Sequence, residues 1–222
     1  MTTAQDIAAN PPAEPPAGRI RKPRRGPRTR KQILDAALVL FSQKGTARAS
    51  VRDIAQAAGI TDAAIYYHFP SKRELFEAFI EERGFTAALA ELETAEVTVG
   101  PEEALPGIAE SALALMWANR GFMKVLMVEA MAEDNVAVEE YRMLVDRWTR
   151  AEARILQIYA AGGLLRTDAV DDLATQCVVT VVGAFMNHLM SADLEPSDAM
   201  EPPPELRQQV AAAMRRIVQS IT

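Results

Sequence analysis

The stretch AGITDAAIYYHFPSKREL, residues 58–75, decides how the first part of this chain folds. Residues 66–69 are four consecutive ring-bearing side chains, whereas a helix that only packs on a core spaces its large residues three or four positions apart. Some of these rings must therefore face solvent or a partner. Pro70 ends the helix, because the residue before a proline is disfavoured in the helical conformation. Ser71 with Glu74 then predicts a capping box that begins the next helix.

A longer amphipathic helix is expected upstream, over residues 29–44. Thr29 and Gln32 have the spacing of a capping box, and Gly45 is a typical stop signal. Apolar side chains recur at helical spacing and form one stripe, which consists of Ile33, Leu34, Ala37, Leu38 and Phe41.

Two short helices follow, over 50–58 and 61–67. Ser50 and Thr61 are good N-cap residues for them, and Gly59 ends the first. Helix, short glycine-containing turn and helix together are typical of a helix-turn-helix, whose second helix enters the major groove of DNA.

The exposed side of this motif carries hydrogen-bond donors and flat side chains. Tyr66 and His68 offer donors to phosphate oxygens, and Lys72 adds a charged donor at a helix start. Tyr67 can reach a base edge or a thymine methyl, and Arg52 can bind guanine through two hydrogen bonds, although it could also be a solvated surface arginine. The remaining candidates for DNA contact are Arg28, Ser50, Thr61 and Ala63. Phe69 is expected to plug the core instead.

The segment SVRDIAQAAGITDAAIYYHFPSKRELFEAFI resembles the DNA-binding domain of the TetR (tetracycline repressor) family of transcription regulators, and the likeness runs from Thr29 to Ile80. It implies a homodimer on a pseudo-palindromic operator and a C-terminal ligand domain whose last two helices, 168–190 and 204–221, form the dimer bundle. The positions that match the family's DNA contacts are Ser50, Arg52, Thr61, Tyr66, Tyr67, His68 and Lys72. Asp62 is acidic where many members are neutral or basic, so it is assigned no contact.

The charge of the chain is divided unevenly. Residues 1–75 hold 13 Lys/Arg and 6 Asp/Glu (+7), whereas residues 76–222 hold 11 and 24 (−13). A basic front end on an acidic remainder points to a polyanionic partner at the front. Residues 1–28 are expected to be a disordered basic arm, because 1–18 are rich in Ala and Pro and 19–31 carry eight Lys/Arg. Such an arm could lie along phosphates or serve only solubility.

The whole chain is expected to be all-α, with a helix-turn-helix domain at 29–75 and a helical ligand-binding and dimerisation domain at 76–222. Breaks between helices are expected at 98–103, 119–121, 161–168 and 194–204. A helix spanning 71–92 would join the two domains and act as the lever of a two-state switch.

The ligand domain is rich in Met and aromatic residues, which can adapt to an apolar effector. Candidate ligand-binding residues are Met116, Trp117, Met127, Trp148, Phe185 and His188, with Met123 and Met131 beside them. Any one of them could instead belong to an ordinary helical core. Asn187 and His188 are polar within an apolar helix and fit either a subunit interface or a ligand contact.

Other classes of function find little support. There is no Gly-rich phosphate loop and no nucleophile elbow, so an enzyme is not expected. Two histidines and Cys177 are far apart in sequence, so neither a metal nor another cofactor is expected, and Cys177 is interpreted as a buried thiol. A lone cysteine cannot form an internal disulfide, which favours the cytoplasm, and no apolar run is expected to reach the roughly 18 residues that a membrane span needs. An architectural DNA-binding protein that uses the basic arm, and an activator of the same fold, remain alternatives.

Overall fold

The computed structural model describes residues 26–83, 85–166, 169–191 and 201–221, and the basic arm predicted at 1–28 lies almost wholly outside them. The described residues form helices and no strand, which confirms the predicted all-α class. The ten helices are α1 (Gly26–Lys44), α2 (Val51–Ala58), α3 (Asp62–His68), α4 (Lys72–Arg83), α5 (Thr86–Thr94), α6 (Pro101–Ala118), α7 (Arg120–Met131), α8 (Asn135–Ala161), α9 (Val170–Ser191) and α10 (Pro204–Ile221).

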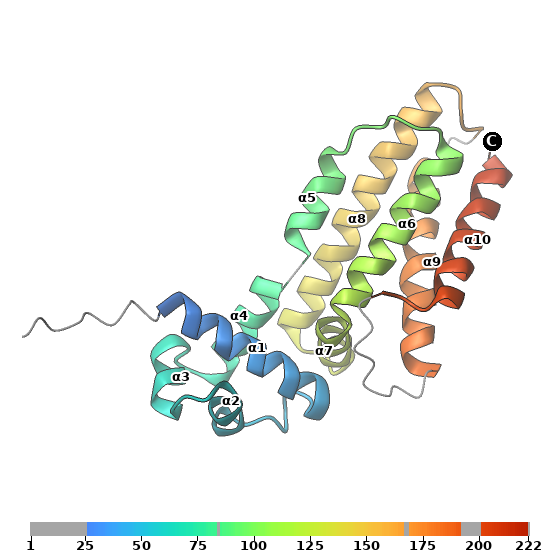
Figure 1. The fold of residues 1–222 in the computed structure, drawn as a ribbon. Helices are drawn as coiled ribbons and strands as arrows, with labels where there is room; N and C mark the ends of the chain where they lie inside the picture. The colour runs from blue at the N-terminus through green and yellow to red at the C-terminus, as the bar shows by residue number, and fades with distance from the viewer. Residues whose placement is uncertain (1–25, 84, 167–168, 192–200, 222) are drawn as a thin grey trace, which may run out of the picture.

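Helices α1 to α4 form a small unit at one end of the molecule, and α5, α6, α8, α9 and α10 form a long bundle that rises from it (Figure 1). α7 lies at the junction, where it packs on both α1 and α8. The two parts share a core of aromatic rings: Phe79 lies 5.5 Å from Phe41 of α1 and 5.6 Å from Phe122 of α7, centroid to centroid. The small unit is thus anchored to the bundle by apolar contact.

The local stop and start signals act as the sequence predicts in α2, α3 and α4. Ser50 and Asp53 form a reciprocal capping box, and Gly59 ends α2 in the left-handed conformation (φ 66°). Thr61 caps α3 through the backbone N–H of Ala64. Each of these caps satisfies backbone donors that a helix start leaves free.

The start of α1 differs from the prediction. Helix α1 begins at Gly26, not at residue 29, so Thr29 lies inside the helix and the predicted capping box at Thr29 and Gln32 is wrong. Proline in the first turn is compatible with this earlier start, because the first backbone N–H groups of a helix have no intrahelical partner.

The predicted joining helix 71–92 is also wrong, since it is divided into α4 and α5. α4 ends at Arg83, and Phe85 precedes α5 without a side-chain cap. A second unpredicted break separates α7 from α8, where Glu133 adopts a left-handed conformation (φ 60°) and Asp134 caps α8. Glutamate is not a signal for that conformation, which is why the sequence did not reveal this turn.

α9 is long and apolar enough to cross a membrane when judged by length and composition alone, contrary to the prediction that no run reaches that length. Its buried side includes Leu173, Val181 and Phe185, and it packs on α6, α8 and α10. This packing makes α9 a core helix of the bundle.

Candidate nucleic-acid interface and internal cavity

The outer face of α3 presents the aromatic residues that the opening stretch crowds together. Tyr66 is 51% exposed and Tyr67 is 85% exposed, whereas Phe69 is 2% exposed and lies in the core as predicted. Arg30 covers the Phe69 ring, with its guanidinium carbon 4.9 Å from the ring centroid, and is ion-paired with Glu82. The two tyrosines therefore form an exposed surface, whereas the neighbouring Phe69 ring is buried.

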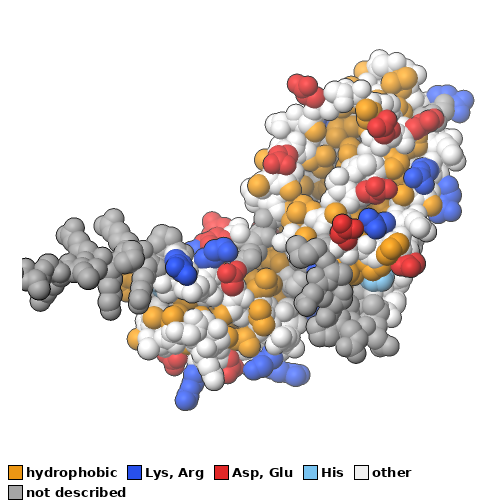
Figure 2. All heavy atoms as spheres, in the orientation of Figure 1, with side chains coloured by type: hydrophobic (Ala, Val, Ile, Leu, Met, Phe, Trp, Pro, Cys, Tyr) orange, Lys and Arg blue, Asp and Glu red, His pale blue; other side chains and the backbone are white. Residues whose placement is uncertain are grey.

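The other predicted DNA-contact residues surround α3. Arg28, Ser50, Arg52, Thr61 and Ala63 are exposed, and His68 is half-buried with its ring 5.3 Å from that of Tyr67. The Nζ of Lys72 reaches back across the unit to the carbonyl of Ala47 at 3.4 Å. Figure 2 shows Lys and Arg side chains projecting from the lower edge of this unit, below α2 and α3. All nine residues thus belong to one compact helical unit.

Electrostatics at the start of α2 are set by its cap. The Asp53 carboxylate accepts the Ser50 backbone N–H at 3.1 Å and lies 4.0 Å from Lys44 Nζ. The hydrogen bonds from Ser50 hold the pKa of Asp53 below its ordinary value, with smaller contributions from Lys44 and Arg52. Asp53 thus makes hydrogen bonds at the helix start, and the neighbouring Arg52 side chain is exposed.

A cavity of about 730 Å³ lies in the bundle, between α5, α6 and α8. Apolar side chains form most of its wall, including Leu92, Ile108 and Leu126. In Figure 2 the orange surface is hollowed between α5 and α6, which locates the mouth of the cavity. This volume lies within the range of small-molecule sites, which are concave and mostly apolar.

The structure places only part of the predicted ligand set on this cavity. Met116, Trp148 and Met123 line it. Trp117 is buried, and its ring is tilted by 59° relative to that of His188, with the centroids 5.5 Å apart. Trp117, Met127, Phe185 and His188 are absent from the lining, and Met131 is exposed on α7.

Sequence reasoning missed the contribution of residues 85–99, which form one side of the cavity. It also missed Tyr159, whose hydroxyl donates to the carbonyl of Val99 at 2.8 Å and so ties this segment to α8. Tyr141, Trp148 and Tyr159 are seven and eleven residues apart, so they share one face of α8. That aromatic stripe was the signal available in the sequence.

Glu152 is a buried acid on the same side of α8, four residues from Trp148. It is 2% exposed, and burial raises its pKa to about 7. The indole N–H of Trp148 makes no well-formed hydrogen bond, although it lies near enough to favour the ionised form of Glu152. Glu152 is thus a buried acid that no sequence pattern indicated.

Cys177 faces Glu152 from α9 and is buried, as predicted. Burial, with a smaller contribution from the Glu152 charge, raises the pKa of the Cys177 thiol to about 12. A thiol with so high a pKa carries almost no thiolate at neutral pH and is a poor nucleophile.

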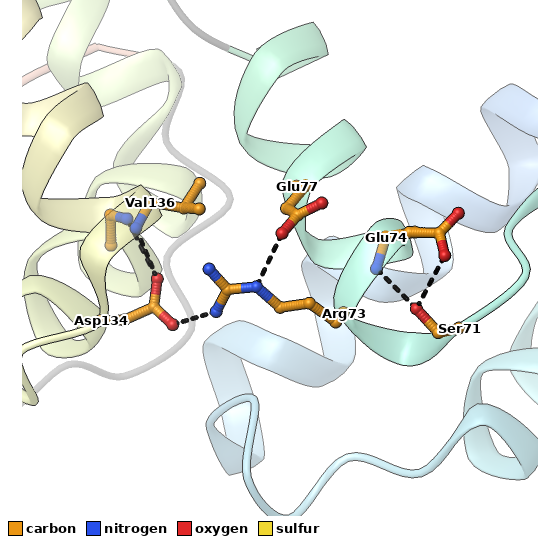
Figure 3. Close-up of polar contacts among 7 residues, drawn as sticks. Ser71, Arg73, Glu74, Glu77, Asp134 and Val136 are labelled. Carbon is orange, nitrogen blue, oxygen red and sulfur yellow. Dashed lines mark hydrogen bonds and ion pairs between the residues drawn. The ribbon is translucent and has the colours of Figure 1, made fainter.

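Polar contacts join the small unit to the bundle. Arg73 of α4 is ion-paired with Asp134, the residue that caps α8 through the backbone N–H groups of Val136 and Ala137 (Figure 3). Arg73 also donates to Glu77, and both acids raise its pKa. Beside it, Ser71 caps α4 by accepting the Glu74 N–H at 3.0 Å.

A second polar link lies nearby, where Thr46 N–H donates to Glu129 Oε1 at 3.3 Å. Thr46 follows α1 and Glu129 belongs to α7. Glu129 of α7 thus contacts the segment that joins α1 to α2.

Comparison with known proteins bears on the identity of the chain. The family described as bacterial regulatory proteins, tetR family, matches residues 33–79. The nucleoid occlusion factor SlmA of Aliivibrio fischeri is 32% identical over 176 residues, which cover 75% of this chain and 87% of SlmA. The protein belongs to the TetR family. It is thus a DNA-binding transcriptional regulator, and members of the TetR family are regulators and not enzymes.

Another TetR-family relative matches over a shorter range. The HTH-type transcriptional regulator AcrR of Shigella flexneri is 53% identical over 53 residues, and this chain spans about a quarter of its length (25%). Such short matches characterise the DNA-binding end, so they carry no statement about the effector.

Solved structures share the fold of the whole described chain. FadR from Bacillus subtilis, in complex with stearoyl-CoA, has a TM-score of 0.68 at 16% identity, and the match covers 86% of this chain and 99% of FadR. A transcriptional regulator from Saccharomonospora viridis, in complex with choline, has a TM-score of 0.63 at 23% identity and covers 84% and 95%. At these identities the likeness establishes the fold alone.

Proposed function

We propose that this TetR-family protein is a repressor that binds a pseudo-palindromic operator as a homodimer and is released by a small apolar effector. The observation that carries the proposal is the 730 Å³ apolar cavity, which lies in the same molecule as an exposed recognition helix. The described contacts through Arg73 and Asp134 connect the two. In this arrangement residues 29–75 bind DNA and 76–222 bind effector and partner subunit.

For DNA binding, two copies of α3 must enter successive major grooves about 34–36 Å apart. Tyr66, His68 and Lys72 then donate to phosphates, which positions the protein. Arg52 and Tyr67 contact base edges, with Arg28, Ser50, Thr61 and Ala63 at the rim of the contact. The basic residues 1–28 add attraction for the duplex that does not depend on sequence.

For dimerisation, α9 presents apolar side chains to solvent. Val179 is 59% exposed and Met190 is 81% exposed, with Gly183 between them on open space. α10, which packs beside α9, adds half-buried Ile217 and Ile221. Exposed apolar side chains along two adjacent helices support a subunit interface there.

The dimer is tested by placing a charge on α9. Val179→Asp should yield a monomer in size-exclusion chromatography with light scattering and should weaken operator binding by at least about 100-fold, because two linked sites bind far more tightly than one. Val128→Asp, the same substitution at an exposed valine of α7, is the control. A dimeric Val179→Asp protein would contradict the proposed interface.

For release, effector and operator must prefer different arrangements of the same molecule. The mechanism we propose is that an occupied cavity shifts α7 and the start of α8, and that Arg73 with Asp134 passes this shift to α4. This replaces the single joining helix predicted from sequence, since α4 and α5 are separate. In this mechanism the Arg73–Asp134 and Thr46–Glu129 contacts couple the effector site to the DNA-binding unit, in place of one continuous helix.

The function is tested by selecting bound DNA from a random pool and measuring operator affinity by fluorescence anisotropy with and without candidate effectors. The expected result is a palindromic site and a loss of affinity with an apolar compound. Arg73→Ala should bind operator and effector but lose most of the coupling between them, whereas Arg142→Ala, an exposed arginine of α8, should not. Unchanged coupling in Arg73→Ala would contradict the mechanism.

A second candidate is DNA binding without effector control, as an architectural protein. SlmA, which aligns over 87% of its length, is named as a nucleoid occlusion factor and not as a promoter repressor. Equal affinity for selected and random duplexes across a salt titration would favour this second candidate. Bound sites beside promoters would favour the repressor or an activator of the same fold. In either case we propose that the protein acts in the cytoplasm.

A further inference from the structure

The charged side chains that line the cavity all have the same sign. Among the described residues of its wall these are Glu91 and Glu96, from α5 and the segment after it, and Glu103 of α6; no Lys, Arg or His of the described chain is among them. All three are exposed, so they stand at the mouth and not in the depth of the cavity. Figure 2 shows acidic side chains around the apolar hollow.

The inner wall behind this mouth is aromatic. Trp148, Tyr141 and Tyr159 line the cavity from one face of α8. Burial raises the pKa of the Tyr159 phenol, and the charge of Glu103 adds a smaller contribution. Glu103 therefore lies near Tyr159. Aromatic faces attract cations and also pack against apolar groups.

The arginines of this region do not offset the acidic mouth. Arg147 is bound through two hydrogen bonds to Glu93, at 2.7 and 3.0 Å. Arg154 donates to the carbonyls of Leu92 and Ala95 at the end of α5. Both lie in a separate hollow outside the cavity, where they fasten α5 to α8.

We propose that the effector of this cavity is an amphiphile that joins an apolar body to a cationic group, either a protonated amine or a quaternary ammonium. The apolar body fills the cavity, and the cation sits at the mouth between the Glu91, Glu96 and Glu103 carboxylates and the aromatic wall. The −13 charge of residues 76–222 draws the same ligand toward the bundle. This inference rests on the proposed function, since it names the chemical class of that effector.

Three probes of equal chain length separate charge from apolar character: octyltrimethylammonium, 1-octanol and octanoate, each titrated calorimetrically into the full-length protein. The ammonium should bind about tenfold more tightly than the alcohol, and octanoate should bind more weakly than both, given the size of cation–π and exposed ion-pair interactions. Equal affinities, or tighter binding of octanoate, would overturn the cationic class.

A variant tests where the preference arises. Replacing the three mouth acids, Glu91→Gln, Glu96→Gln and Glu103→Gln together, should reduce the preference for the ammonium over the alcohol to about twofold and leave the alcohol unchanged. The control has the same net charge but changes exposed acids away from the cavity wall, namely Glu102→Gln, Glu110→Gln and Glu139→Gln, and should keep the preference. If the control also loses the preference for the ammonium over the alcohol, that preference arises from the net negative charge of the protein and not from the three mouth acids.

The outcomes also distinguish the two levels of the proposal. If 1-octanol binds and the ammonium gains nothing, the cationic class is wrong while the apolar effector site stands. If neither compound binds, the cavity is not an effector site and the proposed function itself is wrong.

Discussion

The candidate functional side chains lie on the outer surface of the helix-turn-helix unit but inside the helical bundle. In the small unit the functional side chains point outward, as with Tyr67, and the core residues such as Phe69 are ordinary. In the bundle the candidate ligand residues point inward, into a cavity whose wall is made of the same residue types as a core. An exposed aromatic breaks the usual pattern and can be recognised in a sequence, whereas an aromatic stripe that faces a cavity has the same helical spacing as one that faces a core.

The two parts nevertheless depend on one another, and Phe79 tests how strongly. Phe79→Ala should lower the free energy of unfolding by about 3–5 kcal/mol in urea titrations, because it removes a fully buried ring between Phe41 and Phe122. Probes placed in the small unit and in the bundle should report the same decrease in the free energy of unfolding. Val39→Ala, at an exposed valine of α1, should change little. Loss confined to the small unit would show that the parts are independent.

The pKa shifts of two acids sharpen the comparison, because the pKa of Asp53 in the small unit is lowered by hydrogen bonds from Ser50, whereas that of Glu152 in the bundle is raised by burial. Burial raises the pKa of Glu152 from an ordinary value of 4.5 to about 7. Below pH 4.5 the carboxyl is protonated in both states. Between pH 4.5 and 7 only the unfolded chain ionises, so stability falls as pH rises, by about 3 kcal/mol in total.

Glu152→Gln removes this pH dependence and leaves the shape of the side chain. The variant should gain stability relative to the natural protein between pH 4.5 and 7 and keep a constant advantage above pH 7, measured by urea unfolding at pH 4.5, 6 and 8. Glu110→Gln, at an exposed acid of α6, is the control. Parallel stability curves for the Glu152 variant and the natural protein would show that Glu152 ionises normally.

On the DNA-binding side, base reading and phosphate binding should separate. Arg52→Ala should relax the preference at one base pair by about 1–3 kcal/mol, whereas Lys72→Ala or Tyr66→Phe should weaken all duplexes and, for Lys72, reduce the salt dependence. Affinities for a set of single-substitution duplexes measure both effects. Arg215→Ala, an exposed arginine of α10, is the control. An unchanged preferred sequence in Arg52→Ala would rule out base reading by this residue.

The smallest expected effect concerns the wall of the cavity. Tyr159→Phe removes the hydrogen bond to the Val99 carbonyl and should cost about 1 kcal/mol of stability. It should also increase amide hydrogen exchange in residues 95–100, because this segment loses its tie to α8. Tyr141→Phe, at a tyrosine on the same face without a described hydrogen bond, should do neither. Equal exchange in both variants would show that the tie has no effect.

The features predicted correctly from the sequence are those that depend on interactions between residues a few positions apart. The caps at Ser50 and Thr61 and the stop at Gly59 depend on residues a few positions away, so their patterns predicted α2 and α3 closely. The break after Arg83 was not predicted although Gly84 follows it in the sequence, and the left-handed conformation of Glu133 is one that its residue type does not indicate. The joining helix was therefore predicted too long.

The candidate ligand set shows the same limit. Trp148 and Met116 were predicted and line the cavity, but Trp117, at the position next to Met116, points into the core beside His188. One position along a helix rotates a side chain by about 100°, and only the placement of neighbouring helices decides which direction holds a cavity.

The sequence alone determined the all-α class, the helix-turn-helix and the outward aromatic surface, because helical periodicity, caps and a proline act over a few residues. Only the tertiary structure decided where the cavity lies, that its mouth is acidic, and that Glu152 is buried. These properties arise from helices far apart in sequence that pack side by side, and no local pattern encodes their relative position.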